Sequence, residues 1–323
     1  MQLPTALQTA IQHVTGSLGL DQLIEAREEL TKRYRHPIQG SPFMTSDPQR
    51  QSYVISRMPA TFAALQLALK AVTERGSLPI KSLLDLGAGP GTAMWAACGH
   101  FPEIEAITLL EKDNALLSLG KQLAQGSENK AMQQADWLEK DLEQLSSLPL
   151  HDMVVMSYSI GEVNPNKMEG LLDLCFEAAK ELLLIVEPGT PVGFKRIALI
   201  RDHLIKRGAY VIAPCPHQFP CPMKEGDWCH FSARVERTSL HKRLKGGSLG
   251  YEDEKFSYIA VAKTLIPLPG ARILRQPIRH CGHTEIRLCT PNGVQNRIIS
   301  KKMGPLYQEV RKADWGDSFS PVP

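Results

Sequence analysis

The chain has 323 residues, of which 43% are hydrophobic and 22% charged, as in a soluble globular protein with at least one sizeable core. No apolar run approaches the length of about 18 residues that a membrane helix needs, which excludes a membrane-spanning class. The formal net charge of +3 hides an asymmetry, because residues 230–312 hold sixteen Lys and Arg against six Asp and Glu. This basic segment predicts a polyanionic partner, in particular a nucleic acid.

Residues 1–80 are predicted to form a helical N-terminal region. Apolar residues recur at helical spacing in residues 20–35 and 60–75, and residues 36–49 between them form a loop rich in Pro, Gly and Ser. The first fourteen residues have the pattern of a short amphipathic helix and lack the charged start and apolar centre of a secretory signal. The absence of Arg before Arg27 argues against a mitochondrial presequence, so we expect a cytoplasmic protein of bacterial type.

Residues 81–213 alternate short apolar strands with helices. Strands are expected at residues 83–86, 106–110, 133–138, 153–158, 182–186 and 210–213, and helices at 92–98, 114–123, 167–179 and 191–207. This alternation predicts an α/β fold with a doubly wound parallel sheet that is covered by helices on both faces.

The alternation stops after residue 213. Residues 214–255 have few apolar runs and are predicted to be a Cys-rich, basic insertion, after which residues 256–264 return as the antiparallel last strand of the sheet. Residues 265–323 are predicted to form a small basic β module and tail, with strands around the turn Pro291-Asn292-Gly293 and a helix at residues 305–312.

A Gly-rich turn follows the first strand and opens a helix. Gly87, Gly89 and Gly91 let the backbone bend and approach a ligand, and the helix that begins at Thr92 offers free N–H groups to an anion. The dinucleotide fingerprint G-x-G-x-x-G does not fit, because Thr92 stands where its third glycine would be. Asp85, just before the first glycine, is typical of S-adenosylmethionine (SAM) sites, where it lies near the amino-acid end of the cofactor.

Further polar residues stand in register with this turn. Glu111 ends the second strand, where a carboxylate can accept both ribose hydroxyls, and Asp136-Trp137 are predicted to follow the third strand and contact adenine. The predicted cofactor-binding residues are therefore Asp85, Gly87, Gly89, Gly91, Thr92, Glu111, Asp136 and Trp137. They indicate a class I SAM-dependent methyltransferase (Rossmann-like) sheet.

No catalytic residue is assigned. Residues 157–162, after the fourth strand, read Ser-Tyr-Ser-Ile-Gly-Glu and lack the Asn/Asp-Pro-Pro-aromatic signature that holds a target amine in amino-methylating enzymes. No cysteine lies where a nucleophile that attacks a base is expected, and Glu162 is only a candidate polar contact. The sequence therefore supports SAM binding more strongly than methyl transfer.

Five of the seven cysteines lie in the last third of the chain. Cys215, Cys221 and Cys229 have the spacing C-x5-C-x7-C, which in a reducing compartment indicates a metal site rather than a disulfide. Structural zinc usually has more closely spaced pairs, and cysteine before proline is typical of iron–sulfur ligation, so the spacing favours [4Fe–4S] with zinc as the alternative. The candidates for a fourth ligand are Cys281, Cys289, His217, His230 and His283.

Basic and aromatic residues are interleaved after the cysteines. Five cations are predicted to contact a phosphate backbone: Arg234, Arg237, Lys242, Arg243 and Lys245. Trp228, Phe231 and Tyr251 are candidates for stacking on unpaired bases.

Together these motifs resemble one family, the methyltransferase-like mitoribosomal small-subunit assembly proteins and their bacterial relatives (the methyltransferase-like-17 group). Besides the Gly-rich turn, the similar segments are Tyr53 with Arg57-Met58-Pro59-Ala60-Thr61, Glu187-Pro188-Gly189-Thr190-Pro191 with Gly193-Phe194, Cys215-Pro216-His217, Cys221-Pro222, Trp228-Cys229-His230-Phe231, Gly282-His283, Cys289-Thr290-Pro291-x-Gly293 and Trp315-Gly316-Asp317. The resemblance covers most of the chain, and its cysteine and C-terminal segments are the most specific.

The resemblance implies a [4Fe–4S] cluster on Cys215, Cys221, Cys229 and Cys289, with Cys281 as a bystander. It also implies association with the small ribosomal subunit through rRNA. Separately, we expect a protein that is monomeric when free and contacts no membrane. Two functions follow from it: a SAM-dependent methyltransferase acting on rRNA or a ribosomal protein, and a catalytically inactive assembly factor in which SAM and the cluster are structural. A radical enzyme fits less well, because the radical-SAM spacing C-x3-C-x2-C is absent.

Overall fold

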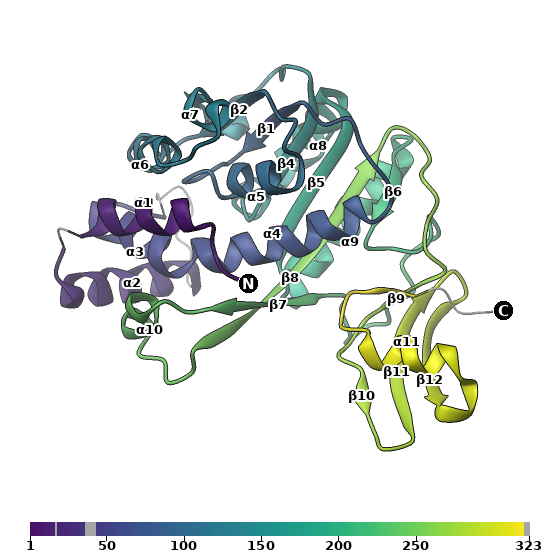
Figure 1. Cartoon of the computed structure of the whole chain (residues 1–323). Coiled ribbons are helices and arrows are strands. Elements are labelled where there is room, and N and C mark those ends of the chain that lie inside the picture. The colour runs from purple at the N-terminus through teal and green to yellow at the C-terminus, as the bar shows by residue number, and fades with distance from the viewer. Residues whose placement is uncertain (17, 36–42, 320–323) are drawn as a thin grey trace.

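The computed structural model describes residues 1–16, 18–35 and 43–319, which form a large mixed sheet flanked by helices and a smaller antiparallel sheet (Figure 1). The part of the predicted loop at residues 36–42 and the last four residues of the predicted tail lie outside the described residues. Within the described ranges, no helix combines the length and apolar character needed to cross a bilayer.

The large sheet has eight strands. They are β1 Ser82–Leu86, β2 Ala106–Glu111, β3 Asp136–Glu139, β4 His151–Ser157, β5 Ala179–Pro188, β6 Tyr210–Ala213, β7 Phe231–Glu236 and β8 Tyr251–Ala262. Their order is β3-β2-β1-β4-β5-β8-β6, with β7 paired to the first half of β8. Strands β1 to β5 are parallel, and β8 enters antiparallel between β5 and β6. The predicted class I methyltransferase sheet is therefore confirmed.

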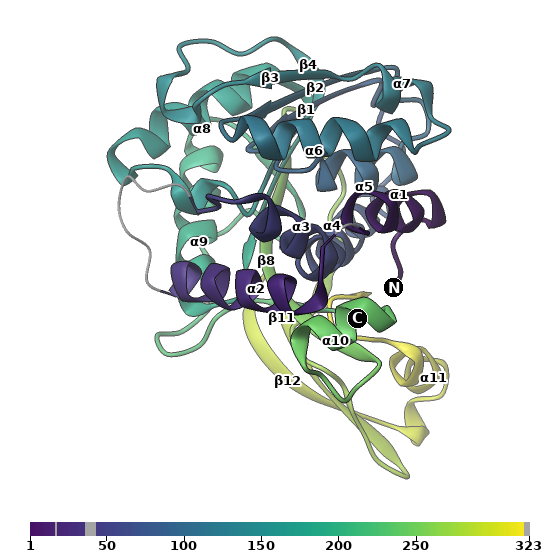
Figure 2. The same ribbon diagram turned by 90° about the vertical axis from the view of Figure 1, so that its left-hand side faces the viewer.

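Helices cover both faces of this sheet, because successive residues of a strand point to opposite sides. Leu83 belongs to one hydrophobic core and Leu84 to the other. The first core packs against α1 Thr5–Thr15, α3 Asp47–Ser56, α4 Met58–Thr73, α5 Thr92–His100 and α6 Asn114–Gln125. The second packs against α8 Pro165–Ala178 and α9 Pro191–Lys206, on the other side of the sheet (Figure 2).

The N-terminal region is helical, as expected. Helix α2 Leu20–Arg35 follows α1, and α3 begins within the predicted loop because Asp47 and Pro48 supply favourable first-turn residues. The N-terminal strand-like segment lies along β7, where the Glu236 N–H donates to the Met1 carbonyl at 3.0 Å. The first residue of the chain is therefore attached to β7 by a backbone hydrogen bond.

Residues 214–255 contain more regular structure than their composition suggested. They include β7, α10 Ser239–Lys245 and the start of β8, which begins five residues before the predicted residue 256. Phe231, Ala233 and Val235 are buried and alternate with more exposed residues, which is the pattern of a strand with one buried face. The polar residues between them concealed this alternation in the sequence.

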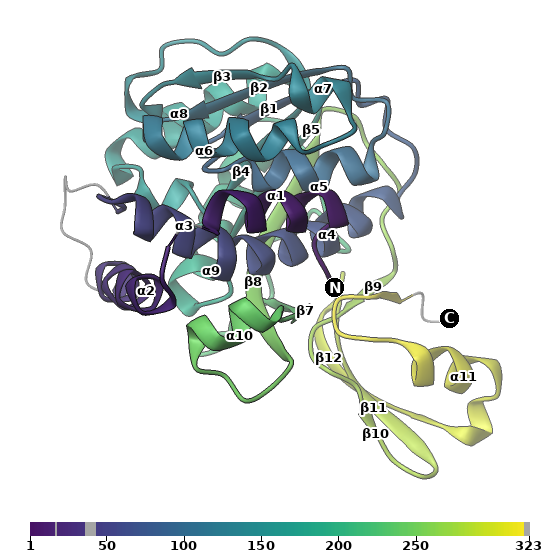
Figure 3. The ribbon, with the colours of Figure 1, turned by 60° about the vertical axis from the view of Figure 1, so that its left-hand side comes forward.

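The second sheet is the C-terminal module, which projects from the body of the protein (Figure 3). It has the strands β9 Ala271–Ile273, β10 Ile278–Arg279, β11 His283–Thr290, β12 Gly293–Ser300 and β13 Ser318–Phe319. The expected hairpin at Pro291-Asn292 joins β11 to β12, and the predicted helix is α11 Pro305–Lys312. Short helices elsewhere are α7 Lys130–Gln133, η1 Leu142–Gln144, η2 Ile160–Glu162 and η3 Lys301–Met303.

Candidate functional site

The three glycines of the Gly-rich turn all have positive φ, but they meet different surroundings. A Cβ added at Gly87 would lie 2.4 Å from the Ser159 Cβ, and one added at Gly91 would lie 2.8 Å from the Trp137 ring. At Gly89 the nearest neighbour would be Leu116, at an ordinary 3.7 Å. Gly87 and Gly91 therefore allow close packing within the protein, whereas Gly89 has room beside it for one more carbon atom, so its surroundings are less crowded.

Asp85 lies at the carboxyl end of β1, directly before this turn. The residue is only 1% exposed, and among the described residues its Oδ2 has no hydrogen-bond partner. Burial, together with the nearby charge of Glu111, raises the pKa of Asp85 to about 8. A buried carboxyl oxygen without a donor is costly, so this position favours a ligand that brings a donor or a positive charge.

Glu111 connects the Gly-rich turn to the next turn along the sheet edge. Its Oε2 accepts from the Gly89 N–H and its Oε1 from the Asp113 N–H, both at 2.9 Å. Asp113 in turn caps α6 and pairs with Arg50 of α3 at 2.9 Å. The structure thus brings Asp85, the glycines and Glu111 to one edge, with a helix of the N-terminal region packed over it.

The predicted position of Asp136 and Trp137 is wrong. Asp136 begins β3 and pairs in register with Thr108, whereas the residue next to Glu111 at the carboxyl end is Glu139. Gln133, the first residue of the predicted strand, is the last residue of the helix α7 instead. Asp136 is exposed at the far end of the strand, and Trp137 is buried beneath the Gly-rich turn. Because ligands bind at the carboxyl ends of parallel strands, neither residue lies where adenine would be contacted.

The acidic residue that follows β3 is Asp141. Its side chain accepts from the Glu143 N–H at 2.9 Å and caps η1, so it is held at the correct edge of the sheet. Sequence reasoning missed this residue because the third strand was placed about three residues too early.

A half-buried polar cluster next to this edge was also missed. Arg57 of α3–α4 pairs with Glu254 of β8 at 3.3 Å, and the Tyr158 hydroxyl donates to the same carboxylate at 3.2 Å. Tyr158 follows β4 and has a φ of 59°, which is uncommon for a non-glycine residue. Burial raises the pKa of Tyr53, which also faces this cluster, to about 12. The only sequence signal was the Tyr53…Arg57 spacing, to which no role had been assigned.

Glu162 ends η2 on the same side of the sheet. It pairs with Lys112 at 3.3 Å, and burial raises the pKa of its carboxyl to about 7. Of the groups described at this edge, it is therefore one that can exchange a proton near neutral pH.

Four cysteines line a single pocket between the large sheet and the C-terminal module. Cys215, Cys221 and Cys229 come from the segment after β6, and Cys289 comes from β11. His217 lies at the rim, with its Nε2 3.6 Å from the Cys289 Sγ. The other fourth-ligand candidates lie elsewhere: His230 stacks on Trp228 and meets Trp315 edge-on, and Cys281 and His283 lie at the β10–β11 turn.

The four thiols are spread more widely than the ligands of one zinc ion. Among the described residues, the one group of three or more His, Cys, Asp or Glu ligand atoms lying within 4.8 Å of one another contains no cysteine. Any three of the four thiols therefore include at least one pair that is farther apart. Four sulfurs at ~2.3 Å from one zinc ion in a tetrahedron lie only ~3.8 Å from one another.

Two buried arginines line the same pocket. Arg272, 1% exposed, donates to the carbonyls of Pro214 and Gly316 at 2.8 Å, and Arg201, 3% exposed, donates to the carbonyl of Phe219 at 2.5 Å. Within the described part of the chain, the Arg272 Nη2 and the Arg201 Nε have no acceptor. Arg272 forms no ion pair there, and Arg201 pairs only with the exposed Asp202. Buried cations of this kind require a counter-charge, so the pocket fits an anionic group.

Polar contacts hold the cysteine segment to the C-terminal module on both sides of Cys229. Asp227 accepts from Arg275 at 2.6 Å and also pairs with Arg287 of β11. The Trp315 indole donates to the His230 carbonyl at 2.9 Å. These contacts attach the cysteine segment to β11 and to the Trp315 segment.

Three of the five predicted RNA-binding cations already have protein partners. Arg234 pairs with Asp253 at 2.8 Å, and Arg237 and Lys245 pair with Glu252 at 2.8 and 2.7 Å. Although burial opposes it, hydrogen bonds from the surrounding basic groups hold the pKa of Glu252 well below its usual range. Arg237 and Lys245 therefore stabilise the β7–β8 hairpin.

The stacking prediction needs a similar correction. Phe231 is buried in the core, and Trp228 donates to the Gly189 carbonyl and stacks on His230. Tyr251 is exposed, but the Arg234 guanidinium lies over one face of its ring, 4.2 Å from the centroid. In the described ranges Lys242 and Arg243 form no ion pair, so they are the members of the predicted set that remain available to a phosphate.

The strand order, the Gly-rich turn and the cysteine pocket define a class I methyltransferase-type protein with an added four-cysteine site. The chain belongs to the family described as "Mitochondrial small ribosomal subunit Rsm22", whose model matches residues 48–320.

The chain is similar to curated relatives in two eukaryotes. It is 26% identical over 286 residues to "Ribosome assembly protein METTL17, mitochondrial" of Homo sapiens, covering 82% of this chain and 61% of the human protein. It is 24% identical to "Rsm22-cox11 tandem protein 2, mitochondrial" of Schizosaccharomyces pombe, covering 85% of this chain and 43% of that protein. The chain thus spans less than two thirds of the length of either relative.

Solved methyltransferases overlap partly with this chain. Magnesium protoporphyrin IX methyltransferase from Synechocystis PCC 6803 with bound SAM has a TM-score of 0.42 at 14% identity, covering 77% of this chain and all of that one. N-methyltransferase NodS from Bradyrhizobium japonicum WM9 has a TM-score of 0.41 at 11% identity, covering 74% and 97%. The assignment of the fold depends on the strand order and register described above, and not on these overlaps.

Proposed function

We propose that this chain binds SAM at the Gly-rich turn, holds a [4Fe–4S] cluster in the cysteine pocket and acts in the assembly of the small ribosomal subunit through its rRNA. The observation that carries the proposal is the pocket itself, which is lined by three cysteines of one segment, by Cys289 of β11 and by two buried arginines with unpartnered guanidinium nitrogens. Membership of the Rsm22 family and the role named for the human relative support the ribosomal part.

The residues at the Gly-rich turn can contact SAM from its amino-acid end to its adenine. Asp85 would accept from the ammonium group, the backbone at Gly89 would lie against the methionine chain, and Glu111 would accept from the ribose hydroxyls. Asp141, rather than Asp136, would accept from the adenine amino group. When bound, SAM supplies an electrophilic methyl group.

The cysteine pocket fits a [4Fe–4S] cluster for two reasons. The thiols are spread more widely than a single zinc ion requires, and a cluster with four thiolate ligands has a net negative charge that Arg201 and Arg272 would offset. When bound, the cluster supplies a cross-link between the cysteine segment and the C-terminal module, and its binding free energy adds to the folding free energy. Anaerobic purification separates it from zinc: we expect a brown protein with broad visible absorbance, and a colourless zinc-replete protein would contradict the cluster.

The side chains near the cofactor edge favour an assembly role over transfer chemistry. Arg57 and Tyr158 are both engaged by Glu254, and burial holds the pKa of Tyr53 and of Tyr158 above neutrality, so neither phenol serves as a base. SAM would then be a structural ligand that orders the turn and the helices above it.

Methyl transfer is the second candidate function, and Glu162 favours it as a group that can accept a proton near neutral pH. The test is transfer of radiolabel from SAM to small-subunit particles isolated from cells that lack this protein. Label that disappears with Glu162→Gln would support transfer. If the particle stays unlabelled although the protein has SAM bound, methyl transfer is contradicted and the assembly role is the remaining function.

The rRNA contact would use exposed cations on α10 and the C-terminal module. The candidates are Lys242, Arg243, Arg297, Lys301, Lys302, Arg311 and Lys312. Crosslinking of the protein to cellular RNA, followed by mapping of the sites, tests this contact. We expect crosslinks concentrated in small-subunit rRNA and weakened by Lys242→Glu with Arg243→Glu. Crosslinks spread over all cellular RNA classes would contradict a specific ribosomal role.

A further inference from the structure

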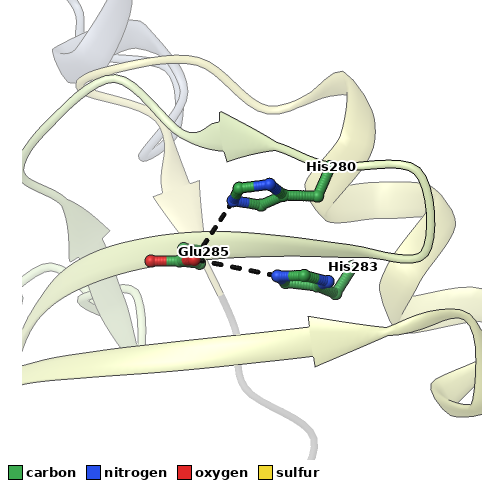
Figure 4. Close-up of side chains that lie close together, drawn as sticks. All are labelled: His280, His283 and Glu285. Carbon is green, nitrogen blue, oxygen red and sulfur yellow. Dashed lines mark ion pairs between the residues drawn. The ribbon is translucent and has the colours of Figure 1, made fainter.

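Two histidines and a glutamate gather at the β10–β11 turn of the C-terminal module, away from both sites described above. His280 directly follows β10, His283 begins β11, and Glu285 lies two residues farther along β11, on the same face as His283 (Figure 4). The Glu285 Oε1 lies 3.1 Å from the His280 Nε2 and 3.7 Å from the His283 Nε2. One ligand atom from each residue lies within 4.8 Å of the other two.

These separations match those of ligands on one small divalent cation. Nitrogen and oxygen ligands at ~2.0–2.1 Å from a tetrahedral zinc ion lie ~3.3 Å apart, between the two measured distances. The two imidazole rings are stacked, with centroids 4.3 Å apart and ring planes at 16° to each other. Near-parallel rings direct their nitrogen lone pairs side by side, so rotation of the two imidazole side chains, with the backbone kept in place, would bring both Nε2 atoms onto one cation.

The backbone around the turn is held by hydrogen bonds on both sides. The His280 N–H donates to the His283 carbonyl at 2.9 Å, and the Lys301 N–H donates to the Gly282 carbonyl at 3.0 Å. The turn is thus closed on itself and attached to η3. Ligands on a fixed turn lose less conformational entropy when they bind a metal ion.

The charges nearby leave the Glu285 carboxylate available. Its partners across the strands are Ile278 on β10 and Ile298 on β12, both apolar. Among the described residues its ion pairs are with His280 and His283 alone. The neighbouring Arg279 is turned away, because its guanidinium donates to the carbonyls of Arg311 and Ala313 at 2.9 and 2.6 Å.

We propose that His280, His283 and Glu285 form a binding site for a divalent transition-metal ion of the Zn²⁺ class, separate from the cysteine pocket. Two imidazoles and one carboxylate suit such an ion, and three protein ligands leave one position for water or for a donor atom of a bound partner. Glu285 and Cys289 are four residues apart on β11, or ~13 Å, so one ion cannot belong to both sites. The ion would cross-link β10 to β11 at the exposed end of the module.

To test the proposal, the whole chain with its cysteine site loaded is titrated with Co²⁺ and, in parallel, with Zn²⁺. Calorimetry measures the affinity and the number of ions bound. Co²⁺ on imidazole and carboxylate ligands gives visible d–d bands without the intense near-ultraviolet absorption that thiolate ligands add, so the two sites are distinguished by their spectra. We expect the wild-type protein to bind one equivalent of Co²⁺ with the spectrum that nitrogen and oxygen ligands give. The variants His280→Gln, His283→Gln and Glu285→Gln should each weaken this binding by roughly tenfold or more, as in other sites that lose a ligand or its support.

Two control variants make the result specific. His13→Gln removes a histidine of α1, and Cys281→Ser removes the thiol between the two histidine ligands of the proposed site. Both variants should still bind one equivalent of Co²⁺ with the wild-type affinity. Unchanged binding in the double variant His280→Gln/His283→Gln would overturn the proposal, as would loss of the equivalent in Cys281→Ser. Because the three ligands lie at the surface, the variants should melt at the wild-type temperature in the absence of metal.

Discussion

Arg272 and Cys289 lie directly opposite each other on the antiparallel strands β9 and β11, and both line the cysteine pocket. Side chains opposite each other in such a pair point to the same face, so a buried cation and a thiol of the C-terminal module enter the pocket together. The Arg272 guanidinium also donates to the Pro214 carbonyl, which precedes Cys215. This residue therefore connects both halves of the proposed cluster site.

Replacing Arg272 with methionine should destabilise the loaded site. The change removes a buried positive charge that faces four thiolates, and removal of one partner of a buried charge pair costs about 3–5 kcal/mol. Iron content per chain and the free energy of unfolding are the measurements. The control is Arg297→Met, which removes an exposed arginine of β12 and should leave both at the wild-type value. Equal iron content and equal free energy of unfolding in the two variants would show that Arg272 does not balance the charge of the cluster proposed for the cysteine pocket.

Replacing Gly89 with alanine should weaken SAM binding by about tenfold or more without unfolding the protein. The new Cβ finds space inside the protein, so the stability cost is the roughly 1–2 kcal/mol of a left-handed backbone, but the methyl group faces the proposed ligand. Gly208→Ala is the matched control, since Gly208 also has positive φ and open surroundings but lies far along the chain from the turn. Calorimetry with SAM compares the two, and an equal loss of affinity would contradict a ligand at Gly89.

The ligand-free protein should lose stability as the pH rises from about 4 to about 8 because of Asp85. The folded-state pKa of about 8 lies above the ordinary value of 3.8, so between these values the folded state binds a proton that the unfolded state has released. The contribution of this proton to the free energy of unfolding is complete below about pH 4. As the pH rises from there to about 8, this contribution declines by at most ~1.4 kcal/mol per pH unit. Denaturant unfolding of the wild type and of Asp85→Asn measures the effect. The variant should be the more stable of the two at pH 7 and should lack this slope; identical pH dependence in both proteins would contradict the assignment.

Cys289→Ser should release the C-terminal module from the cysteine segment, whereas Cys281→Ser should not. Cys289 is a buried residue of the pocket, and Cys281 is exposed at the β10–β11 turn. We expect the first variant to lose the brown colour and to be cleaved faster by protease between β8 and β9, within residues 263–270. The second variant should match the wild type in both assays. If both variants kept the cluster, the fourth ligand would have to be another group, with His217 the nearest candidate.

Local signals were sufficient for most of the elements. The strands and helices of residues 81–213 follow from periodicity, and the Gly-rich turn follows from residues that tolerate positive φ. The error at β3 arose because the short apolar signal around Met132 and Trp137 is split between α7 and the strand. A shift of three residues was enough to move Asp136 to the wrong end of a parallel strand and to conceal Asp141.

Sequence alone determined the class of the sheet, the position of the Gly-rich turn and three of the four cysteines, because each depends on residues that are close together along the chain. The family resemblance implied Cys289 as the fourth ligand, but only the tertiary structure shows that it lines one pocket with the other three cysteines, and that Arg201 and Arg272 line the same pocket as buried cations. It also decided that Arg237 and Lys245 are neutralised by Glu252. Those outcomes depend on pairing between segments far apart in the chain, which the packing of the strands brings together and which no local pattern records.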